Sequence, residues 1–400
     1  VSGSMLNNCG RWCRMSNPNR ILPYSRQLIE EDDIAAVVDV LKSDYLTQGP
    51  VVGRFENALA EYCGAKYAVA FSNGTAALHA AYFAAGIGAG DEIITSPNTF
   101  AATANAALYL GAKPVFADIE PDTGNINPAQ IEHKINAKTK AIVPIHYGGH
   151  PVDIDAISDI ARQHSLLVIE DACHAIGAQY KGQKIGAHSD MSVFSFHPVK
   201  PITTGEGGAV TTNNPDYYAK LRLFCSHGIT KDPALLEKKN AGAWFYEMQI
   251  LGYNFRITDI QCALGCTQLA KIDRFIEDKK KIVAKYQQAF ADDPRIAIPF
   301  EKSFARSSWH LVAARLQGAL TAKRREIFDA LRAAGLWVQV HYIPVYWHPY
   351  YRKLGFAPGL CPEAENLYAA EISLPVFPGM TEDETQYVIQ TIKDVLARYE

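Results

Sequence analysis

The chain has 400 residues, of which 48% are hydrophobic and 20% are charged, so it can form two domains with large cores and is too apolar for a disordered protein. Its net charge of −3 provides no basic excess, which argues against nucleic acid as the main partner. No apolar run approaches the roughly 18–20 residues that span a bilayer, and the eight cysteines show no disulfide spacing. We therefore expect a cytoplasmic protein, without a membrane partner, whose thiols are free.

From about residue 30, helical and strand-like patterns alternate along the chain. Helices are predicted at residues 31–43, 55–64, 74–86, 100–111, 128–135 and 153–165. Strands are predicted at residues 66–71, 91–97, 113–119, 140–147, 166–171 and 192–196. Gly64 is a typical residue to end the second helix. Strands separated by helices in this way predict an α/β fold with a mostly parallel sheet that is covered on both faces.

The pattern changes near residue 255, where a long helical stretch begins. The later elements are helical at residues 258–290, 322–335 and 381–399 and strand-like at 310–316 and 337–344. The last helix opens with a Thr-x-x-Glu capping box from Thr381 to Glu384. These elements predict a smaller α+β domain. We divide the chain into an N-terminal tail (1–20), a large domain (21–265) and a small C-terminal domain (266–400).

Residues that could carry chemistry follow several of the predicted strands. They are Gly74, Thr75, Phe100, Asp171, His174, Ser195 and Lys200. Ligands of open α/β sheets bind beyond the carboxyl ends of the strands, so these residues could converge on one cleft. Each also has an ordinary structural interpretation. Gly74 and Thr75 suit a simple helix start, Asp171 could cap a turn, Phe100 and His174 could belong to the core, and Lys200 could extend to the surface.

The combination is more informative than its parts. A helix start with free amides favours a phosphate group. An aromatic side chain can stack on a ring, and a carboxylate can pair with a protonated ring nitrogen. A loop lysine in a desolvated site can form a Schiff base with an aldehyde. Together these features are what pyridoxal 5′-phosphate requires.

Longer motifs carry a resemblance to a known family. The most diagnostic is "SFHPVKPITTGEGGAV" around Lys200, and others are "NGTAALHAA", "EDACHAIGA", "SHGI" and "LGYNFRITDIQCALG". From about Tyr24 to the C-terminus the chain resembles the DegT/DnrJ/EryC1/StrS sugar aminotransferases. This resemblance implies the fold of the aspartate aminotransferase type (fold type I): a large, mostly parallel mixed sheet flanked by helices, with a smaller C-terminal domain.

The resemblance also implies roles for single residues. Lys200 would bind pyridoxal 5′-phosphate covalently, Asp171 would pair with the ring nitrogen, and His174 would lie beside the ring. Gly74, Thr75 and Ser195 would hold the phosphate, and Phe100 would stack on the ring. Asn254 would reach the phosphate in a neighbouring subunit, which implies a homodimer with shared active sites. L-glutamate would be the amino donor, and no metal is implied.

A closer resemblance is to the branch of this family that makes UDP-4-amino-4,6-dideoxy-N-acetyl-β-L-altrosamine for pseudaminic acid biosynthesis. The sequence segments that show this resemblance include "SDYLTQGP", "KPITT" and "QVHYIPVY". By this resemblance the nucleotide-sugar pocket would include Tyr24, Asp44, Tyr45, Leu46, Thr47, Gly74, Ser195, Asn254, His341, Tyr342, Ile343 and Pro344. The stretch "SDYLTQGP" could also be an ordinary loop after a helix. Related enzymes that aminate other UDP- or dTDP-4-ketosugars share most of these sequence segments.

One departure and three rival functions bear on this interpretation. Where many relatives have Phe-Arg-Ser-His-Gly, this chain has Cys225 in place of the arginine, and Arg222 or Arg256 would be the nearest spare cation. A branch that removes the C3 hydroxyl group has histidine where Lys200 stands. Another deoxygenating branch holds an iron–sulfur cluster with grouped cysteines, which do not follow Lys200 here. A regulator with this fold would carry a DNA-binding segment, and the residues before Tyr24 are too few for one.

Overall fold

A computed structural model describes residues 21–239 and 242–399, so the predicted N-terminal tail lies outside the described residues. Its centre is a seven-stranded sheet with the strand order β2-β10-β9-β6-β5-β3-β4. These strands are β2 (Tyr67–Phe71), β3 (Glu92–Thr95), β4 (Lys113–Phe116), β5 (Thr139–Val143), β6 (Leu167–Asp171), β9 (Met191–Ser195) and β10 (Gly208–Thr212). All pairs are parallel except those of β10, which is antiparallel to β2 and β9. The predicted mostly parallel sheet is confirmed.

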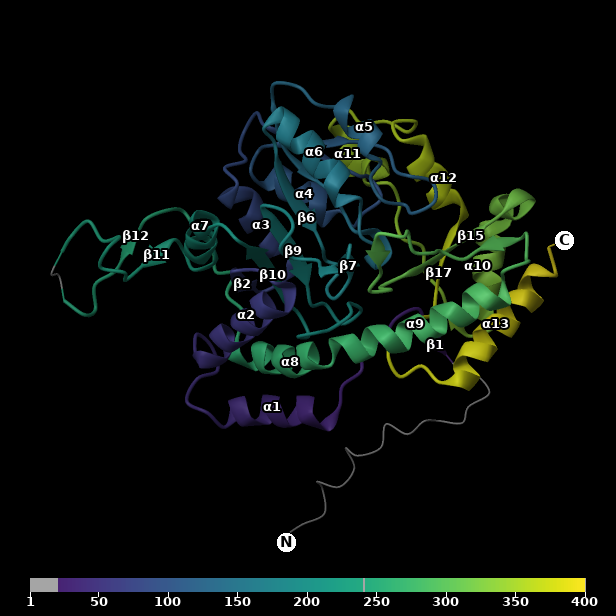
Figure 1. Cartoon of the computed structure of the whole chain (residues 1–400), viewed down its shortest axis with the longest axis horizontal. Helices are drawn as coiled ribbons and strands as arrows, with labels where there is room; N and C mark the ends of the chain where they lie inside the picture. The colour runs from purple at the N-terminus through teal and green to yellow at the C-terminus, as the bar shows by residue number, and fades with distance from the viewer. Residues whose placement is uncertain (1–20, 240–241, 400) are drawn as a thin grey trace, which may run out of the picture.

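Helices cover both faces of this sheet, as the buried side chains demonstrate (Figure 1). In β2, Ala68 and Ala70 face one hydrophobic core, and Val69 and Phe71 face the other. The first core contains residues of α2 (Pro50–Cys63), α6 (Ile154–His164) and α8 (Asp259–Ala270). The second contains residues of α3 (Gly74–Ala84), α4 (Ala102–Tyr109) and α7 (Pro215–Cys225). The short helix α5 (Pro128–Glu132) and α1 (Glu31–Leu41) lie at the periphery, α1 against α8.

Local sequence signals explain where several helices begin and end. Gly64 ends α2 with a left-handed backbone (φ 70°), as its sequence position predicts. Asn73 begins α3 by accepting a hydrogen bond from the amide of Ala76. Thr381 and Glu384 form the predicted capping box at the start of the last helix.

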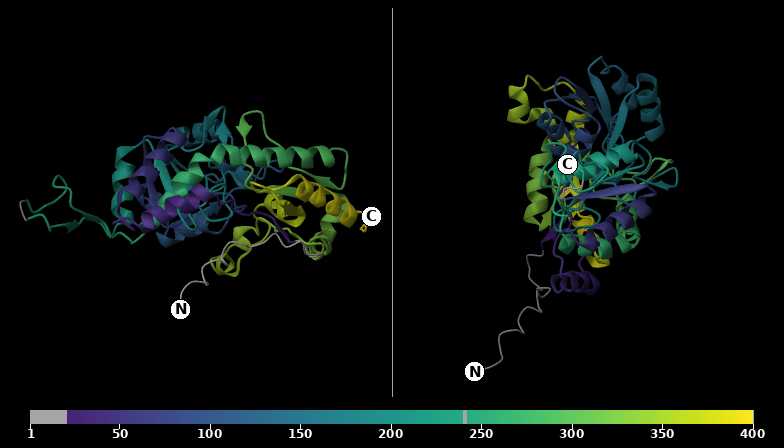
Figure 2. Two further views of the ribbon diagram at one scale, coloured as in Figure 1. Left: turned by 90° about the horizontal axis from the view of Figure 1, so that it is seen from below. Right: turned by 90° about the vertical axis from the view of Figure 1, so that its left-hand side faces the viewer.

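A second unit forms around another hydrophobic core at the C-terminal end of the chain. Helix α9 (Ile272–Ala289) follows α8 after a single break at Lys271 and leads into this unit (Figure 2). Its sheet has the order β13-β15-β17, and α10 and α13 cover it. These elements are β13 (Ile296–Ala297), β15 (Val312–Leu316), α10 (Arg324–Ala333), β17 (Glu371–Leu374) and α13 (Glu382–Leu396). The domain boundary between residues 265 and 266 stays a prediction. Along α9, Phe275 packs in a core of the large unit, whereas Ile282 packs in the core of the second unit.

The predicted strand at 337–344 is wrong for most of its length. Only β16 (Leu336–Trp337) is a strand, and it pairs with β1 (Leu22–Pro23). The amide of His341 donates to the carboxyl group of Glu371 rather than to a neighbouring strand. Pro344 has no amide hydrogen to donate. The segment therefore leaves the small unit and enters the side of the main cavity.

Short elements complete the fold. The helices α11 (Pro349–Lys353) and α12 (Pro362–Ala370) lie between β16 and β17 in the chain, and β7 (Gln179–Tyr180), β8 (Gln183–Lys184) and β14 (Ala305–Arg306) form a small sheet. The strands β11 (Ile229–Thr230) and β12 (Glu247–Met248) belong to an arm, described at residues 227–239 and 242–254, which extends far from the body of the molecule (Figures 1 and 2). Within the described residues, no helix has the length and apolar character that a membrane crossing requires.

Candidate active site

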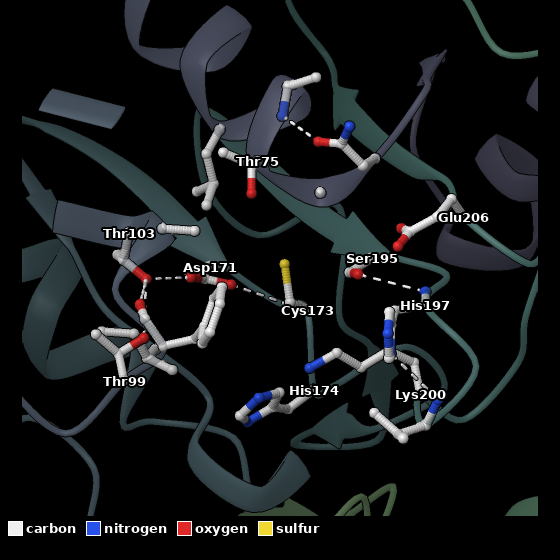
Figure 3. A pocket seen from close by; sticks show the side chains of 18 of the residues that line it. Thr75, Thr99, Thr103, Asp171, Cys173, His174, Ser195, His197, Lys200 and Glu206 are labelled. Carbon is white, nitrogen blue, oxygen red and sulfur yellow. Dashed lines mark hydrogen bonds between the residues drawn. The ribbon is translucent and has the colours of Figure 1, made fainter. Parts of the chain in front are cut away.

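The carboxyl ends of the central strands open into one cavity of about 770 Å³. Asp171 ends β6, Ser195 ends the neighbouring strand β9, and Gly74 begins α3 beside them. Most of the predicted residues line this cavity, as Figure 3 shows for several of them: Tyr24, Gly74, Thr75, Phe100, Asp171, His174, Ser195, Lys200, His341 and Tyr342. Residues separated by more than 300 positions in the sequence thus meet at the sheet edge where ligands of this fold class bind.

The other predicted residues do not line the cavity of their own chain. They are Asp44, Tyr45, Leu46, Thr47, Asn254, Ile343 and Pro344. Asp44 and Tyr45 border a separate surface pocket beside α2 and α8. Thr47 forms an isolated bridge with Thr258, and Asn254 forms one with Ser226.

Asp171 is fixed by hydrogen bonds from two sides. Its Oδ2 accepts a hydrogen bond from the hydroxyl group of Thr103 over 2.6 Å, and its Oδ1 accepts one from the amide of Cys173 over 3.1 Å. Only 5% of Asp171 is exposed. The hydroxyl group of Thr99 lies 2.8 Å from that of Thr103 and extends this chain of polar groups. The carboxylate therefore keeps one orientation at the cavity wall.

Lys200 points into the cavity toward His174, as Figure 3 shows. Its loop is held by a hydrogen bond from its own amide to the carbonyl group of His197 and by another from Ser25 to the carbonyl group of Val199. Burial lowers the pKa of the Lys200 amine, although Cys173 and Asp171 act in the opposite direction. The lysine therefore has more of the neutral, nucleophilic amine than a surface lysine has.

The start of α3 forms a close-fitting cradle. A Cβ atom on Gly74 would lie 2.9 Å from the Cβ of Ser195, and one on Gly208 would lie 2.5 Å from the carbonyl oxygen of Asn73. Among the described residues, no acceptor pairs with the amides of Gly74 and Thr75. The two free amides, the hydroxyl groups of Thr75 and Ser195 and the positive end of the helix are a suitable donor set for a phosphate group.

His174 lies between the sheet edge and the segment from the small unit. Its Nε2 is 3.0 Å from the hydroxyl group of Tyr342, and the two rings are nearly parallel with centroids 5.9 Å apart. Burial lowers the pKa of His174 well below its ordinary value, and the nearby Lys200 lowers it further. The imidazole is therefore neutral at physiological pH.

These residues fit pyridoxal 5′-phosphate, the cofactor predicted from the sequence. The phosphate cradle at Gly74, the carboxylate of Asp171 and the amine of Lys200 border one cavity, with the aromatic side chain of Phe100 at its rim. Phe100 is 62% exposed, which leaves its ring free to contact a ligand. The arrangement suits a ring whose phosphate, nitrogen and aldehyde each need a different protein group.

Sequence reasoning missed several residues of the site. Thr103 lies one helical turn after Thr99, a spacing that could have indicated a shared face. His310 and Cys173 also reach the site, and only the position of Cys173 beside Asp171 could have suggested it. Nothing in the sequence around His310 indicates that it contacts Lys200, because the two residues are 110 positions apart.

The prediction that Arg222 is a spare cation is wrong. Its guanidinium group donates to both carboxylate oxygens of Glu56, over 2.7 and 3.0 Å. Arg256 donates to the hydroxyl group of Ser226 over 3.2 Å and is the cation that remains near Cys225. The sulfur of Cys225 itself faces the carbonyl group of Arg222 and is buried.

Comparisons with known proteins agree with this geometry. The chain is 40% identical over 381 residues to a UDP-4-amino-4,6-dideoxy-N-acetyl-beta-L-altrosamine transaminase of Campylobacter jejuni, which covers 94% of this chain and 98% of the relative. The structure resembles that of Helicobacter pylori PseC, an aminotransferase involved in the biosynthesis of pseudoaminic acid. For that pair the TM-score is 0.89 at 35% identity, covering 95% of this chain and 100% of the other.

A third similar protein is represented by a structure in its pyridoxal phosphate form. It is a putative sugar aminotransferase, Spr1654, of Streptococcus pneumoniae, with a TM-score of 0.89 at 31% identity over 95% of this chain and 100% of the other. Residues 27–393 match the DegT/DnrJ/EryC1/StrS aminotransferase family. The fold is therefore that of the pyridoxal phosphate aminotransferases, and the chain belongs to the DegT/DnrJ/EryC1/StrS family.

Proposed function

We propose that this aminotransferase transfers an amino group from L-glutamate to UDP-2-acetamido-2,6-dideoxy-β-L-arabino-hex-4-ulose, giving UDP-4-amino-4,6-dideoxy-N-acetyl-β-L-altrosamine. The observation that carries a transamination site is the convergence of Lys200, Asp171 and the cradle at Gly74 on one cavity. The choice of sugar rests on the names of the relatives from Campylobacter jejuni and Helicobacter pylori. Tyr24, His341 and Tyr342 line the same cavity, where a sugar would meet Lys200.

In this proposal each residue has a distinct task. Bound pyridoxal phosphate supplies an electron sink, which makes the Cα–H bond of the amino donor acidic. Lys200 would hold the cofactor covalently in the resting enzyme. Once the amino donor has released it, Nζ of Lys200 would take up the proton from Cα and deliver it to C4′ of the cofactor. Asp171 would hold the ring through its nitrogen, and the hydroxyl group of Thr103 and the amide of Cys173 keep that carboxylate in place.

The second half of the reaction uses the same groups in the reverse direction. The sugar must place its C4 beside Nζ of Lys200, which returns a proton on the face it occupies. Tyr342 and His174, linked over 3.0 Å, form the wall opposite the sheet edge. Because burial raises the pKa of Tyr342 well above its ordinary value, its hydroxyl group stays protonated and can donate to an oxygen of the ligand.

Replacement of Lys200 by alanine tests the catalytic assignment. We expect loss of the cofactor's visible absorbance and of detectable turnover, because no other cavity-lining lysine can replace it in the described residues. Lys140→Ala is a matched control, since Lys140 is an exposed lysine on β5. Normal turnover by the Lys200 variant would refute the assignment.

The substrate is tested with a panel of 4-ketosugar nucleotides and L-glutamate. Mass spectrometry and NMR of the products identify the sugar and the configuration at C4. The proposal predicts the highest kcat/KM with the UDP-linked N-acetyl 4-ketosugar. Faster conversion of a dTDP-linked or another UDP-linked ketosugar would assign the enzyme to a sister activity of the family.

We also propose that the active unit is a homodimer in which each copy completes the other's site. The arm supports this, because Trp244, Met248 and Leu251 in its described part are 77%, 63% and 76% accessible. Asn254 and Thr47 lie outside the cavity of their own chain, where Asn254 forms a bridge with Ser226 and Thr47 forms one with Thr258. A second copy of the chain would give these residues a site to contact.

A subunit-complementation experiment tests the shared site. Lys200→Ala and Asn254→Ala, each expected to be inactive, are co-expressed with different tags, and the mixed dimer is purified. In a shared site, one of the two sites of the mixed dimer carries both changes and the other carries none, so about half of the wild-type activity should return. A mixed dimer as inactive as the two parents would show that Asn254 serves its own chain.

A further inference from the structure

His310 contacts the reactive lysine from the opposite unit of the fold. It lies just before β15, and its Nε2 is 3.4 Å from Nζ of Lys200. Only 3% of His310 is exposed. Its ring also packs against that of His174, with centroids 4.4 Å apart. The lysine amine is therefore bounded by two imidazoles, of which His310 is the one within hydrogen-bonding reach of Nζ.

The other ring nitrogen of His310 indicates which tautomer is present. Nδ1 is buried and has no hydrogen-bond partner among the described residues. If Nε2 accepted a hydrogen bond from Lys200, Nδ1 would carry the ring hydrogen as a buried donor without an acceptor. If Nε2 carries the hydrogen, Nδ1 is only an unused lone pair. Buried donors without partners are rarer in proteins than acceptors without partners, so the geometry favours hydrogen on Nε2.

This tautomer distinguishes between the two forms of lysine. A neutral amine has a lone pair that can accept the hydrogen of Nε2, whereas an ammonium group has only donors. We propose that His310 is a positioning residue, which donates a hydrogen bond from Nε2 to Lys200 and thereby holds its amine neutral and in place. The inference rests on the role of Lys200 in the proposed function. A neutral amine is the form that can bond to an aldehyde and take up a proton.

The surrounding charges are consistent with this role. Burial lowers the pKa of His310 well below its ordinary value, and Lys200, His174, Lys279 and His341 lower it further, so the ring stays neutral. Burial also lowers the pKa of Lys200, while Cys173 and Asp171 raise it. The negative charge of Asp171 favours the charged ammonium form of Lys200. A hydrogen bond donated by Nε2 of His310 favours the neutral amine instead.

The test measures the pKa of Lys200 in the full-length protein after removal of the cofactor. The rate of labelling by acetic anhydride is followed against pH, and the peptide that contains Lys200 is quantified by mass spectrometry. His310→Phe keeps a ring of similar shape but removes the donor. We expect the pKa of Lys200 to rise by about 0.5–1, which slows labelling below that pKa by about 3–10-fold.

The opposite tautomer predicts the opposite sign, because loss of an acceptor would destabilise the ammonium form and lower the pKa of Lys200. An unchanged or lowered pKa in His310→Phe would therefore overturn the inference. His310→Gln, whose amide can donate from a similar position, should return the pKa toward the wild-type value. If it instead stays at the value of the Phe variant, packing rather than the hydrogen bond is responsible, and the inference also fails.

His79→Phe is the matched control. His79 is another buried histidine with an unpartnered Nε2, but its ring packs on Phe224 and Tyr253 and not on Lys200. It should leave the pKa of Lys200 unchanged. Thermal unfolding of each variant verifies that it is folded. Because labelling needs no substrate, a failed substrate assignment would leave this result intact, and an unchanged pKa would leave the transaminase assignment intact.

Discussion

Replacement of Glu371 by glutamine should remove a large pH dependence of stability. Glu371 begins β17 with 0% exposure, and its carboxyl group accepts hydrogen bonds from the amide of His341 over 2.7 Å and from the hydroxyl group of Ser373. Burial raises the pKa of Glu371 to about 8, although these hydrogen bonds and the charges of Arg324 and Arg315 oppose it. The folded chain therefore keeps this group protonated at pH values where the unfolded chain loses the proton.

The sign and size of the effect follow from the two pKa values. Between the ordinary value of 4.5 and the folded value of about 8, the folded chain binds one more proton than the unfolded chain. The contribution of Glu371 to the free energy of unfolding is complete below pH 4.5. It is lost as the pH rises to about 8, and the free energy of unfolding falls by about 1.4 kcal/mol per pH unit. The whole difference corresponds to about 5 kcal/mol of unfolding free energy.

Urea unfolding at pH 5, 6.5 and 8 measures this contribution at one fixed protein concentration. The wild type should lose stability relative to Glu371→Gln across this range, because glutamine is neutral at every pH and can still accept from His341. Glu61→Gln, which changes an exposed glutamate of α2, is the matched control and should follow the wild type. Parallel pH profiles of wild type and Glu371→Gln would refute the reasoning.

Two further predictions concern the walls of the cavity. Thr103→Val should lower the unfolding free energy of the cofactor-free protein by about 1.5–3 kcal/mol, because it removes the 2.6 Å hydrogen bond to the buried carboxylate of Asp171. Urea unfolding measures this loss. Thr103→Ser keeps the hydroxyl group and should lower the unfolding free energy by less. Gly74→Ala should cost about 1–3 kcal/mol and weaken cofactor binding in a fluorescence titration, because its Cβ would lie 2.9 Å from that of Ser195. Gly53→Ala, which meets no atom within 4 Å, should be neutral or slightly stabilising, and equal effects of the two alanines would contradict the steric explanation.

The central sheet could be predicted from the sequence because each of its strands carries its own signal. Runs such as 66–71 and 166–171 are apolar on both faces, which is typical of strands buried between two helical layers. The polar residues Asp171 and Ser195 then mark strand ends, where a site is expected in this class of fold. The combination of a helix start, an aromatic side chain, a carboxylate and a loop lysine predicted the cofactor, and the long motif around Lys200 indicated the family.

The remaining features depend on contacts between distant parts of the chain. The segment at 337–344 has a strand-like composition, but the buried carboxyl group of Glu371 takes the amide of His341 that a sheet would have used. The contact of His310 with Lys200 exists only because the small unit packs against the large one. The described parts of the arm carry no hydrophobic period that would predict an extended structure. Trp244, Met248 and Leu251 are exposed, whereas Ile250 and Tyr253 pack against the large unit.

The charges of the cavity give a further reason to expect a second copy at the site. Burial lowers the pKa of the imidazoles of His174, His310 and, to about 3, His341, so all three remain neutral. In the described residues, Lys200 is the only lysine that lines the cavity, and no arginine lines it. The start of α3 can balance the cofactor phosphate. A nucleotide diphosphate would bring two more negative charges, and we infer that a neighbouring chain, rather than the cavity of a single chain, provides the cations that bind it.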